Sequence, residues 1–206
     1  MEKKINMEGI LIQVETKCSA YGDIRNNNLD LSVSSEDLLN QKYFIGIYET
    51  DSDLHNKGKI GTIEMTYMDV CMAEETGYDV FMLFDLIDAE KQGVCNYLFD
   101  DNEPNDEYVG MDLDVIYIDK IFIKKEYRNM GIGSSIVKEL PMIVRNILKL
   151  RPGCLVLLAN PFEIEDKELI PERDKEKIEK LIRFYQKNGF ERIENTQYLA
   201  RNMDYK

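Results

Sequence analysis

The stretch YRNMGIGSSIVKEL, residues 127–140, places an arginine and two closely spaced glycines at the start of a segment with helical apolar spacing. It follows VIYIDKIFI, residues 115–123, a run with the β-branched and aromatic content of a strand. A strand that passes through a short turn into a helix presents several unpaired backbone N–H groups at one point. Together with the helix dipole, these groups favour an anion, most often a phosphate. We therefore predict an anion-binding turn, in which Gly131 and Gly133 allow close approach and Arg128 adds a bidentate cation.

Two common phosphate-binding motifs do not fit this turn. A P-loop requires Gly-Lys-Ser or Gly-Lys-Thr, which the chain lacks. A dinucleotide fingerprint requires a third glycine at position 136, where the chain has Ile136. A glycine-containing turn that binds no ligand stays open as the alternative.

The apolar pattern predicts the remaining elements. The expected strands cover residues 8–17, 42–50, 59–72, 114–123, 153–159, 190–195 and 197–203. The expected helices cover residues 34–40, 79–99, 131–150 and 171–188. The second helix is expected to break near Gly93, and the third to kink at Pro141, which removes the bond to the Val137 carbonyl. The last is expected to open at Pro171 and stop at Gly189. The predicted fold class is α/β with a mixed sheet.

Charge is unevenly distributed along the chain, whose formal net charge is −13. Residues 74–114 carry 13 acidic side chains against Lys91 alone, whereas residues 116–151 hold eight basic and three acidic ones. The overall charge argues against nucleic acid as a partner, because phosphate contacts need clustered Lys and Arg. The acidic segment has two interpretations, a solvated face or an attractor for a cationic substrate.

The length of 206 residues predicts one domain, residues 1–206, with the acidic segment as an insertion and a candidate lid over a substrate. No apolar run approaches the about 20 residues that cross a bilayer, so no membrane partner is expected and the cytoplasm is the expected location. The four cysteines lie far apart, and His55 is expected to be a solvated loop residue without a second ligand. We predict no metal site.

Two segments resemble the GNAT superfamily of N-acetyltransferases. IFIKKEYRNMGIGSSIV, residues 121–137, is similar to the family's acetyl-CoA-binding segment, whose signature is R/Q-x-x-G-x-G/A after a strand. Arg128, Gly131 and Gly133 fill the three defining positions. LIRFYQKNGFERI, residues 181–193, is similar to the family's helix-turn-strand segment. Two matches in the right order, with a strand between them, are more specific than either alone. The resemblance covers residues 114–203 and is weak before residue 75.

This resemblance implies a GNAT fold whose central sheet is splayed, with acetyl-CoA as the acyl donor and no metal. The backbone of Ile121, Phe122 and Ile123 would pair with the pantetheine arm, and Asn160 would lie against the cofactor. The pyrophosphate would be held by Arg128, Asn129, Met130, Gly131, Ile132, Gly133 and Ser134. The chain departs from the family in a long acidic link after Pro161 and in the acidic segment before the fourth strand, so the acceptor site is not carried over.

Acetyl transfer to an amine needs a proton donor for the departing thiolate and a proton acceptor for the amine. By the resemblance, Tyr185 is the phenolic acid; the alternative is a tyrosine packed on the apolar face of its helix. The base is predicted from strand alternation, which places Tyr117, Asp119, Ile121 and Ile123 on one face. Burying a carboxylate in an apolar strand costs free energy unless the group is ion-paired or has a catalytic role. Asp119 is therefore the first candidate for the base. The alternative for Asp119 is an ion pair with a basic residue of a neighbouring strand; a water chain is a further alternative.

These inferences favour an N-acetyltransferase that transfers acetyl from acetyl-CoA to a primary amine of a cationic small molecule or peptide. Two alternatives stay open: a non-catalytic acyl-CoA-binding sensor on the same fold, and an acidic interaction protein whose glycine turn binds nothing. A homodimer is also left open.

Overall fold

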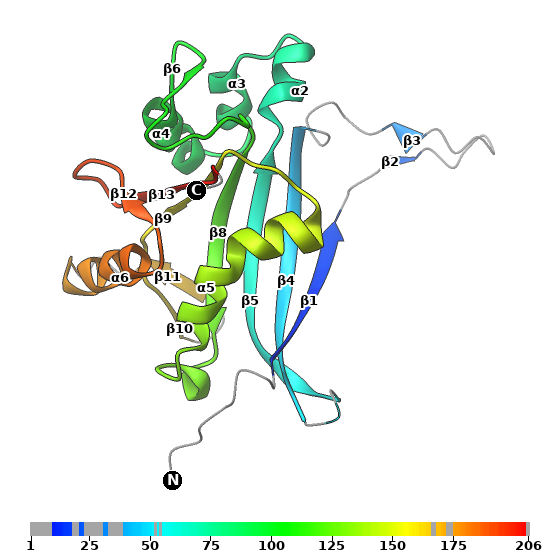
Figure 1. Cartoon of the computed structure of the whole chain (residues 1–206), viewed down its shortest axis with the longest axis vertical. Helices are drawn as coiled ribbons and strands as arrows, with labels where there is room; N and C mark the ends of the chain where they lie inside the picture. The colour runs from blue at the N-terminus through cyan, green and yellow to red at the C-terminus, as the bar shows by residue number, and fades with distance from the viewer. Residues whose placement is uncertain are drawn as a thin grey trace.

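The computed structural model describes residues 10–17, 21–22, 31–32, 39–51, 53, 55–165, 168–171 and 175–204. A seven-stranded sheet runs through the molecule (Figure 1). In spatial order its strands are β1 (Ile10–Lys17), β4 (Asn40–Thr50), β5 (Asn56–Met68), β8 (Val115–Ile123), β9 (Cys154–Leu158), β13 (Tyr198–Asn202) and β12 (Glu191–Arg192). Every neighbouring pair is antiparallel except β8 and β9, which are parallel. The predicted α/β class with a mixed sheet is confirmed.

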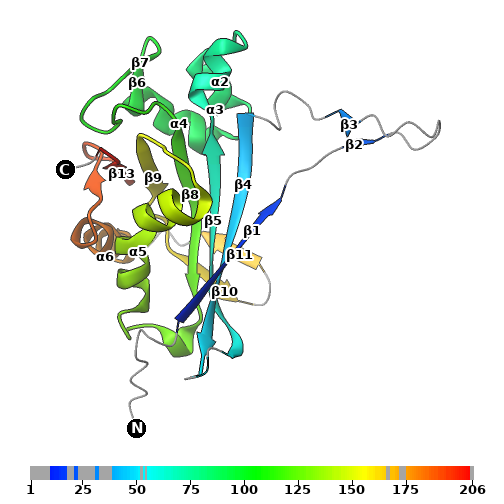
Figure 2. The ribbon, with the colours of Figure 1, turned by 45° about the vertical axis from the view of Figure 1, so that its right-hand side comes forward.

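The helices gather in three places around this sheet. They are α2 (Val70–Glu75), α3 (Val80–Asp85), α4 (Ala89–Leu98), the 3-10 helix η3 (Lys125–Tyr127), α5 (Ile132–Met142), the π-helix η4 (Ile143–Leu148) and α6 (Lys175–Lys187). Short ladders pair β2 (Tyr21–Gly22) with β3 (Leu31–Ser32), β6 (Phe99–Asp100) with β7 (Glu103–Pro104), and β10 (Phe162–Glu165) with β11 (Glu168–Pro171). Figures 1 and 2 show α2, α3 and α4 at one end of the sheet, α5 across the face of the central strands, and α6 near β12.

Three of these helices begin at an aspartate that caps them. The side chains of Asp69, Asp79 and Asp88 accept the backbone N–H of the third residue that follows, at the starts of α2, α3 and α4. Such caps satisfy N–H groups that have no partner inside the helix. Part of the acidic excess is therefore explained by the need to start two short helices between residues 74 and 114.

Two buried clusters occupy the two faces of the central strands. The first joins α5 and α6 to one face and contains Ile116 and Ile118 of β8. The second joins α2, α3 and α4 to the other face and contains Val115 and Tyr117 of β8. Successive residues at the start of β8 thus alternate between the clusters, as the pleat of a strand requires.

This alternation is interrupted at Asp119. Glu64 of β5 pairs with Lys120, but the next residue of β5, Met65, pairs with Ile118, so Asp119 is an extra residue in β8. Such a β-bulge reverses which face the following residues occupy. Ile121 and Ile123 accordingly pack against the first cluster, together with Ile118. The prediction that Tyr117, Asp119, Ile121 and Ile123 share one face is therefore wrong, because it assumed an unbroken alternation.

The parallel pairing of β8 with β9 is short. It joins Val115, Ile116 and Tyr117 to Cys154, Leu155 and Val156, and the described ladder ends there. β8 continues to Ile123 with β5 as its partner on one edge only. From Ile118 onward the two parallel strands separate, which is the splayed sheet that the sequence led us to expect.

Two local predictions need correction. The break between residues 79 and 99 lies at Leu86–Asp88, between α3 and α4, and Gly93 lies inside α4. A Cβ atom at position 93 would lie 2.8 Å from the Tyr198 hydroxyl, which is too close. Close packing therefore requires glycine at this position. Pro171 ends β11 and does not open α6, which begins at Lys175.

The other irregular positions follow the expected physics. After Pro141 the helix continues as the π-helix η4, and the Val137 carbonyl, which lacks the proline N–H, has Nη1 of Arg201 at 3.5 Å. Gly189 ends the last helix with a φ of 94°, as predicted. In the helix expected at 34–40, residues 34–38 lie outside the described part of the chain.

Candidate active site

A pocket of about 660 Å³ lies where β8 and β9 separate. The second half of β8 and the end of β9 form two of its walls, and the turn before α5 and one face of α6 form the others. The predicted site residues that line it are Asp119, Ile121, Phe122, Ile123, Arg128, Asn129, Gly131, Gly133, Ser134, Asn160 and Tyr185. Met130 and Ile132 do not line it. Ile132 is 1% exposed within the first cluster, and Met130 packs against that cluster.

The start of α5 supplies backbone donors to this pocket. Gly131 is the N-cap, its φ is 81°, and no side chain caps the helix. The N–H of Ser135 bonds the Gly131 carbonyl at 3.0 Å, so the N–H groups of Ile132, Gly133 and Ser134 precede the first intrahelical bond. A left-handed φ is favourable for glycine and strained for other residues, which explains why the turn needs glycine at position 131.

Cationic side chains flank these donors. Nε of Arg128 donates to the Ile123 carbonyl at 2.8 Å, and the guanidinium carbon lies 5.9 Å from the centroid of the Phe122 ring. Lys177 and Lys180 of α6 also line the pocket. Because Arg128 and the positive end of the α5 dipole meet at residues 128–134, this end of the pocket, here called the cationic end, suits a polyanion.

A buried amide connects α5 to α6 beside the pocket. The Ser134 hydroxyl donates to Oδ1 of Asn188, and Nδ2 of Asn188 donates to the Phe184 carbonyl at 2.7 Å. Asn188 is buried. Since the hydroxyl hydrogen of Ser134 is already donated, the residue can offer an anion its backbone N–H.

Tyr185 reaches the same pocket from α6. Its ring packs edge-on against Phe184 and Phe190, with centroids 5.2 Å and 5.9 Å away. Burial raises the pKa of its phenol above the ordinary value, and no described residue makes a hydrogen bond with the hydroxyl. At neutral pH Tyr185 is therefore a protonated phenol whose hydrogen is not committed elsewhere in the described chain.

Asp119 lies at the other end of the β8 wall and is held on both oxygens. Oδ2 accepts a hydrogen bond from the Thr66 hydroxyl at 2.8 Å, and Oδ1 lies 2.7 Å from Nζ of Lys91. The ion pair considered for Asp119 is thus present, but its cation comes from helix α4. Asn160, after β9, borders the pocket on the opposite wall.

Lys91 is the residue that the sequence analysis missed. Its one visible signal is that it is the single basic residue among 13 acidic ones between residues 74 and 114. That isolation could have indicated that Lys91 pairs with carboxylates of the same segment. Its aspartate partner is 28 positions away in sequence, at a bulge that no residue pattern marked.

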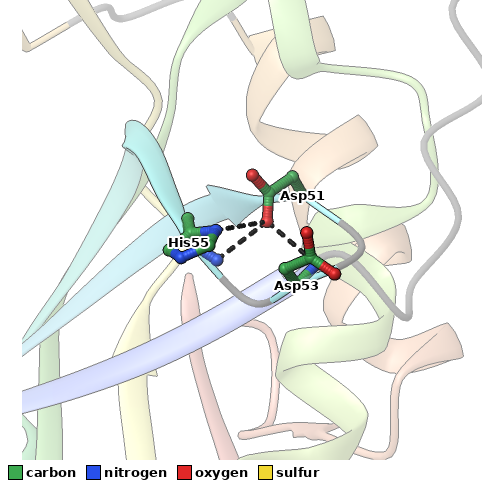
Figure 3. A group of neighbouring side chains, drawn as sticks. All are labelled: Asp51, Asp53 and His55. Carbon is green, nitrogen blue, oxygen red and sulfur yellow. Dashed lines mark hydrogen bonds and ion pairs between the residues drawn. The ribbon is translucent and has the colours of Figure 1, made fainter.

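A separate group of side chains lies on the turn between β4 and β5 (Figure 3). Asp51, Asp53 and His55 have potential ligand atoms within 4.8 Å of one another, so the expectation that His55 has no second ligand nearby is wrong. Oδ1 of Asp51 accepts the backbone N–H groups of Asp53 and His55, and the bond from His55 is the main cause of the lowered pKa of Asp51. These contacts account for the arrangement as a capped turn, and none of the three residues lines the pocket.

No helix in the described part of the chain combines the length and the apolar character that a bilayer-spanning segment needs.

Several solved structures resemble the chain over most of its length. One is described as AtaTR bound with AcCoA, with 14% identity over 96% of this chain and 95% of that chain and a TM-score of 0.43. A KacTA–DNA complex has 13% identity, covers 94% of each chain and has a TM-score of 0.43. A nourseothricin acetyltransferase has 10% identity over 95% of this chain and 99% of that chain, with a TM-score of 0.38. No curated protein matches the chain in sequence.

A family model gives a more specific result. The model of the acetyltransferase (GNAT) domain matches residues 70–192, which is more than half of the chain. The matched range contains every residue that lines the pocket, from Ile118 to Tyr185. The glycine turn, the separated strands and the helix that carries Tyr185 all fall inside it. The chain belongs to the GNAT acetyltransferase family.

Proposed function

We propose that this protein transfers an acetyl group from acetyl-CoA to a primary amine of a cationic acceptor. The observation that carries the proposal is one pocket, at the separation of β8 and β9, that is lined by the glycine turn, by Tyr185 and by Asp119. A polyanion-binding end and a proton donor in one cavity are what a coenzyme A thioester requires. Residues 1–206 would act as one domain.

The donor is assigned to the cationic end of the pocket. Backbone N–H groups of Gly131, Ile132, Gly133 and Ser134 would hold the diphosphate, and Arg128 would add a charge-assisted bond. Met130 and Ile132 can contribute through their backbone alone, because their side chains pack toward the core.

The thioester arm is assigned to the space between the separated strands. The edge of β8 that faces β9 has no ladder partner after Tyr117 in the described part of the chain. The backbone of Ile121 can therefore pair with the amides of a pantetheine arm, whereas the carbonyl of Phe122 points toward Gly61 of β5 on the opposite edge. The Ile123 carbonyl already accepts from Arg128, which leaves its N–H for that purpose. Asn160 borders the arm from the β9 side.

In the proposed reaction the acceptor first gives one proton to water; the neutral amine nitrogen then bonds to the thioester carbonyl carbon, and the carbon–sulfur bond breaks. The thiolate takes the proton of the Tyr185 phenol, which is protonated at neutral pH. The proton lost by the amine goes to Asp119 or to a water molecule next to it. The phenolate then regains its proton from solvent.

The acceptor is assigned a positive charge because of the carboxylates at the Asp119 end. Asp119 lines the pocket and belongs to a network with Asp88, in a segment with a large acidic excess. Negative potential there would raise the local concentration of a protonated amine. A polyamine, an aminoglycoside and a Lys-rich peptide share this chemistry.

Two measurements test the proposal. Isothermal titration with acetyl-CoA is expected to give saturable binding, and absence of binding would remove the enzymatic assignment. Release of free thiol is then followed with spermidine, kanamycin and a Lys-rich peptide as acceptors. Thiol release with at least one amine is expected; binding without release from any of them would identify an acyl-CoA sensor.

A further inference from the structure

Lys91 is a buried cation held between two carboxylates. Its side chain is 5% exposed, and Nζ lies 2.7 Å from Oδ2 of Asp88 and 2.7 Å from Oδ1 of Asp119. The ammonium also lies 4.6 Å from the centroid of the Tyr117 ring. Lysine is rarely buried this deeply unless it is paired, because taking the charge out of water is costly.

Lys91 is charged in this environment. Burial by itself would lower the pKa of Lys91, but the carboxylates of Asp119 and Asp88 outweigh it and raise that pKa. Lys91 is therefore an ammonium ion at neutral pH, with two short bonds that fix its position.

Every element packed around this ammonium adds a polar group. From β8, the Tyr117 hydroxyl donates to Oε1 of Glu90 at 2.6 Å. From β13, the Tyr198 hydroxyl donates to the Glu90 carbonyl at 2.8 Å. From β5, Thr66 donates to Asp119, and Glu64 pairs with Lys120 of β8 at 3.7 Å. Asp88 of α4 and Asp119 of β8 are the carboxylates in contact with Lys91.

Asp119 is the one member of this network that both contacts Lys91 and lines the pocket. Its position at the bulge leaves it without a strand neighbour directly opposite. The bonds from Thr66 and Lys91 are therefore what determines its orientation. Helix α4, although it belongs to the acidic segment outside the pocket, acts on the pocket through this one contact.

We propose that Lys91 is a positioning residue, which holds the Asp119 carboxylate through its charge and orients it toward the amine acceptor. The inference rests on the proposed acetyl transfer and deepens it by assigning a task to α4. Lys91 has no direct contact with the substrate in this account, and its effect on the reaction passes through Asp119.

The test compares Lys91→Met with Lys91→Arg. Methionine keeps an apolar stem of similar length and removes the charge, and arginine keeps the charge. The quantity measured is kcat/KM for the amine that gives thiol release, at saturating acetyl-CoA, as a ratio of variant to wild type across pH. This ratio cancels the titration of the acceptor itself. Thermal unfolding is recorded at each pH to confirm that the variant is folded.

The ratio for Lys91→Met is expected to fall by up to about tenfold for each unit by which the pH is lowered. A proton can compete for the Asp119 carboxylate once the cation that lies 2.7 Å from Oδ1 is removed. Lys91→Arg is expected to restore a flat ratio close to one. A lysine whose role is structural alone would give a ratio that is independent of pH for the folded variant, and that result would overturn the inference.

A charge-compensated variant keeps the test decisive if Lys91→Met does not fold. Lys91→Met combined with Asp88→Asn removes one positive and one negative charge, and asparagine still offers an oxygen to cap α4. The double variant is expected to show the same falling ratio, whereas Asp88→Asn alone leaves the Lys91–Asp119 pair intact and is expected to give a flat one. A flat ratio for the double variant would also overturn the inference.

Failure of this inference can be told apart from failure of the proposed function. If wild-type protein acetylates none of the amines, the proposed function fails and the role of Lys91 falls with it. If wild-type protein acetylates an amine and the ratio stays flat in the charge-removing variants, only the role of Lys91 is overturned.

Discussion

The two ends of the pocket are built in different ways. The cationic end comes from one continuous stretch, residues 128–134, whose backbone conformation is set by Gly131 at the start of α5. The Asp119 end comes from three elements, β5, β8 and α4, which meet at a bulge. The difference teaches that the cationic end is a local property of the chain, while the Asp119 end exists only once the fold has formed. Under the proposed function, variants at the cationic end should change donor affinity, and variants at the Asp119 end should change turnover.

The largest expected effect is that of Gly131→Arg on donor binding. Arginine would enter the open space above the helix start and would also be strained at a φ of 81°. The dissociation constant for acetyl-CoA, measured by isothermal titration, is expected to rise more than about 100-fold.

The matched control for that variant is Gly77→Arg, on the turn after α2. Gly77 has a φ of 84° and the same open surroundings, but it does not line the pocket. It therefore carries the backbone strain without the obstruction, and donor binding close to wild type is expected. Equal loss of binding in both variants would mean that strain, and not position, explains the first result.

Tyr185→Phe tests whether Tyr185 contributes to the chemical step and not to donor binding. The turnover rate is expected to fall about 100-fold, the typical contribution of a positioned general acid. The dissociation constant for acetyl-CoA is expected to stay within about threefold of wild type, since the ring and its packing remain. Tyr43→Phe, which removes another buried phenol with a raised pKa outside the pocket, is the control. Unchanged turnover in Tyr185→Phe would remove this residue as the acid.

Asp119→Asn addresses the acceptor end. The substitution keeps the shape and removes the charge, so kcat/KM for the amine is expected to fall at least about tenfold while acetyl-CoA affinity is kept. Asp114→Asn is the comparison, because Asp114 also accepts hydrogen bonds at the same strand but does not line the pocket. A loss of acetyl-CoA affinity in Asp119→Asn would contradict the division of the pocket into two ends.

Arg128→Gln should give a moderate loss of donor affinity. One charge-assisted bond contributes about 1.5 to 3 kcal/mol, which predicts a roughly 10- to 100-fold rise in the dissociation constant and a weaker dependence on salt. Lys125→Gln removes a nearby exposed charge that does not line the pocket, and it is expected to have little effect. The same loss in both variants would point to general electrostatic attraction and not to a specific contact.

The smallest expected effect is that of Gly133→Ala. A methyl group there would lie 3.7 Å from the Phe184 ring, an ordinary contact, and the φ of Gly133 is not positive. Acetyl-CoA affinity is expected to change by less than about threefold. A large loss would show that the anion approaches position 133 more closely than position 131.

What the sequence could predict follows the same division. Arg128, Gly131 and Gly133 were identifiable because a strand, a turn and a helix N-terminus are consecutive in the chain, and the confirmed strands and helices follow local apolar patterns. The bulge at Asp119 was not identifiable, because its residue pattern does not differ from an unbroken strand. The ion pair with Lys91 depends on contact between distant segments, so residue spacing could not reveal it.

Gly93 and Pro171, two residues of types that often mark the ends of helices, show how local rules can mislead. Gly93 was expected to break a helix, yet it lies inside α4 because the Tyr198 hydroxyl leaves no room for a side chain. Pro171 was expected to open a helix, yet it ends β11, where its missing N–H is equally tolerable. For Gly93, packing against a distant part of the chain decided the outcome.

The amide of Asn188 ties the first turn of α5 to the carbonyl of the residue that precedes Tyr185. The glycine turn and the helix that carries Tyr185 therefore share one buried hydrogen-bond partner. Under the proposed function, any shift of the turn on donor binding would act on Asn188 and, through it, on the backbone next to Tyr185, so that donor binding and the position of the phenol would be linked.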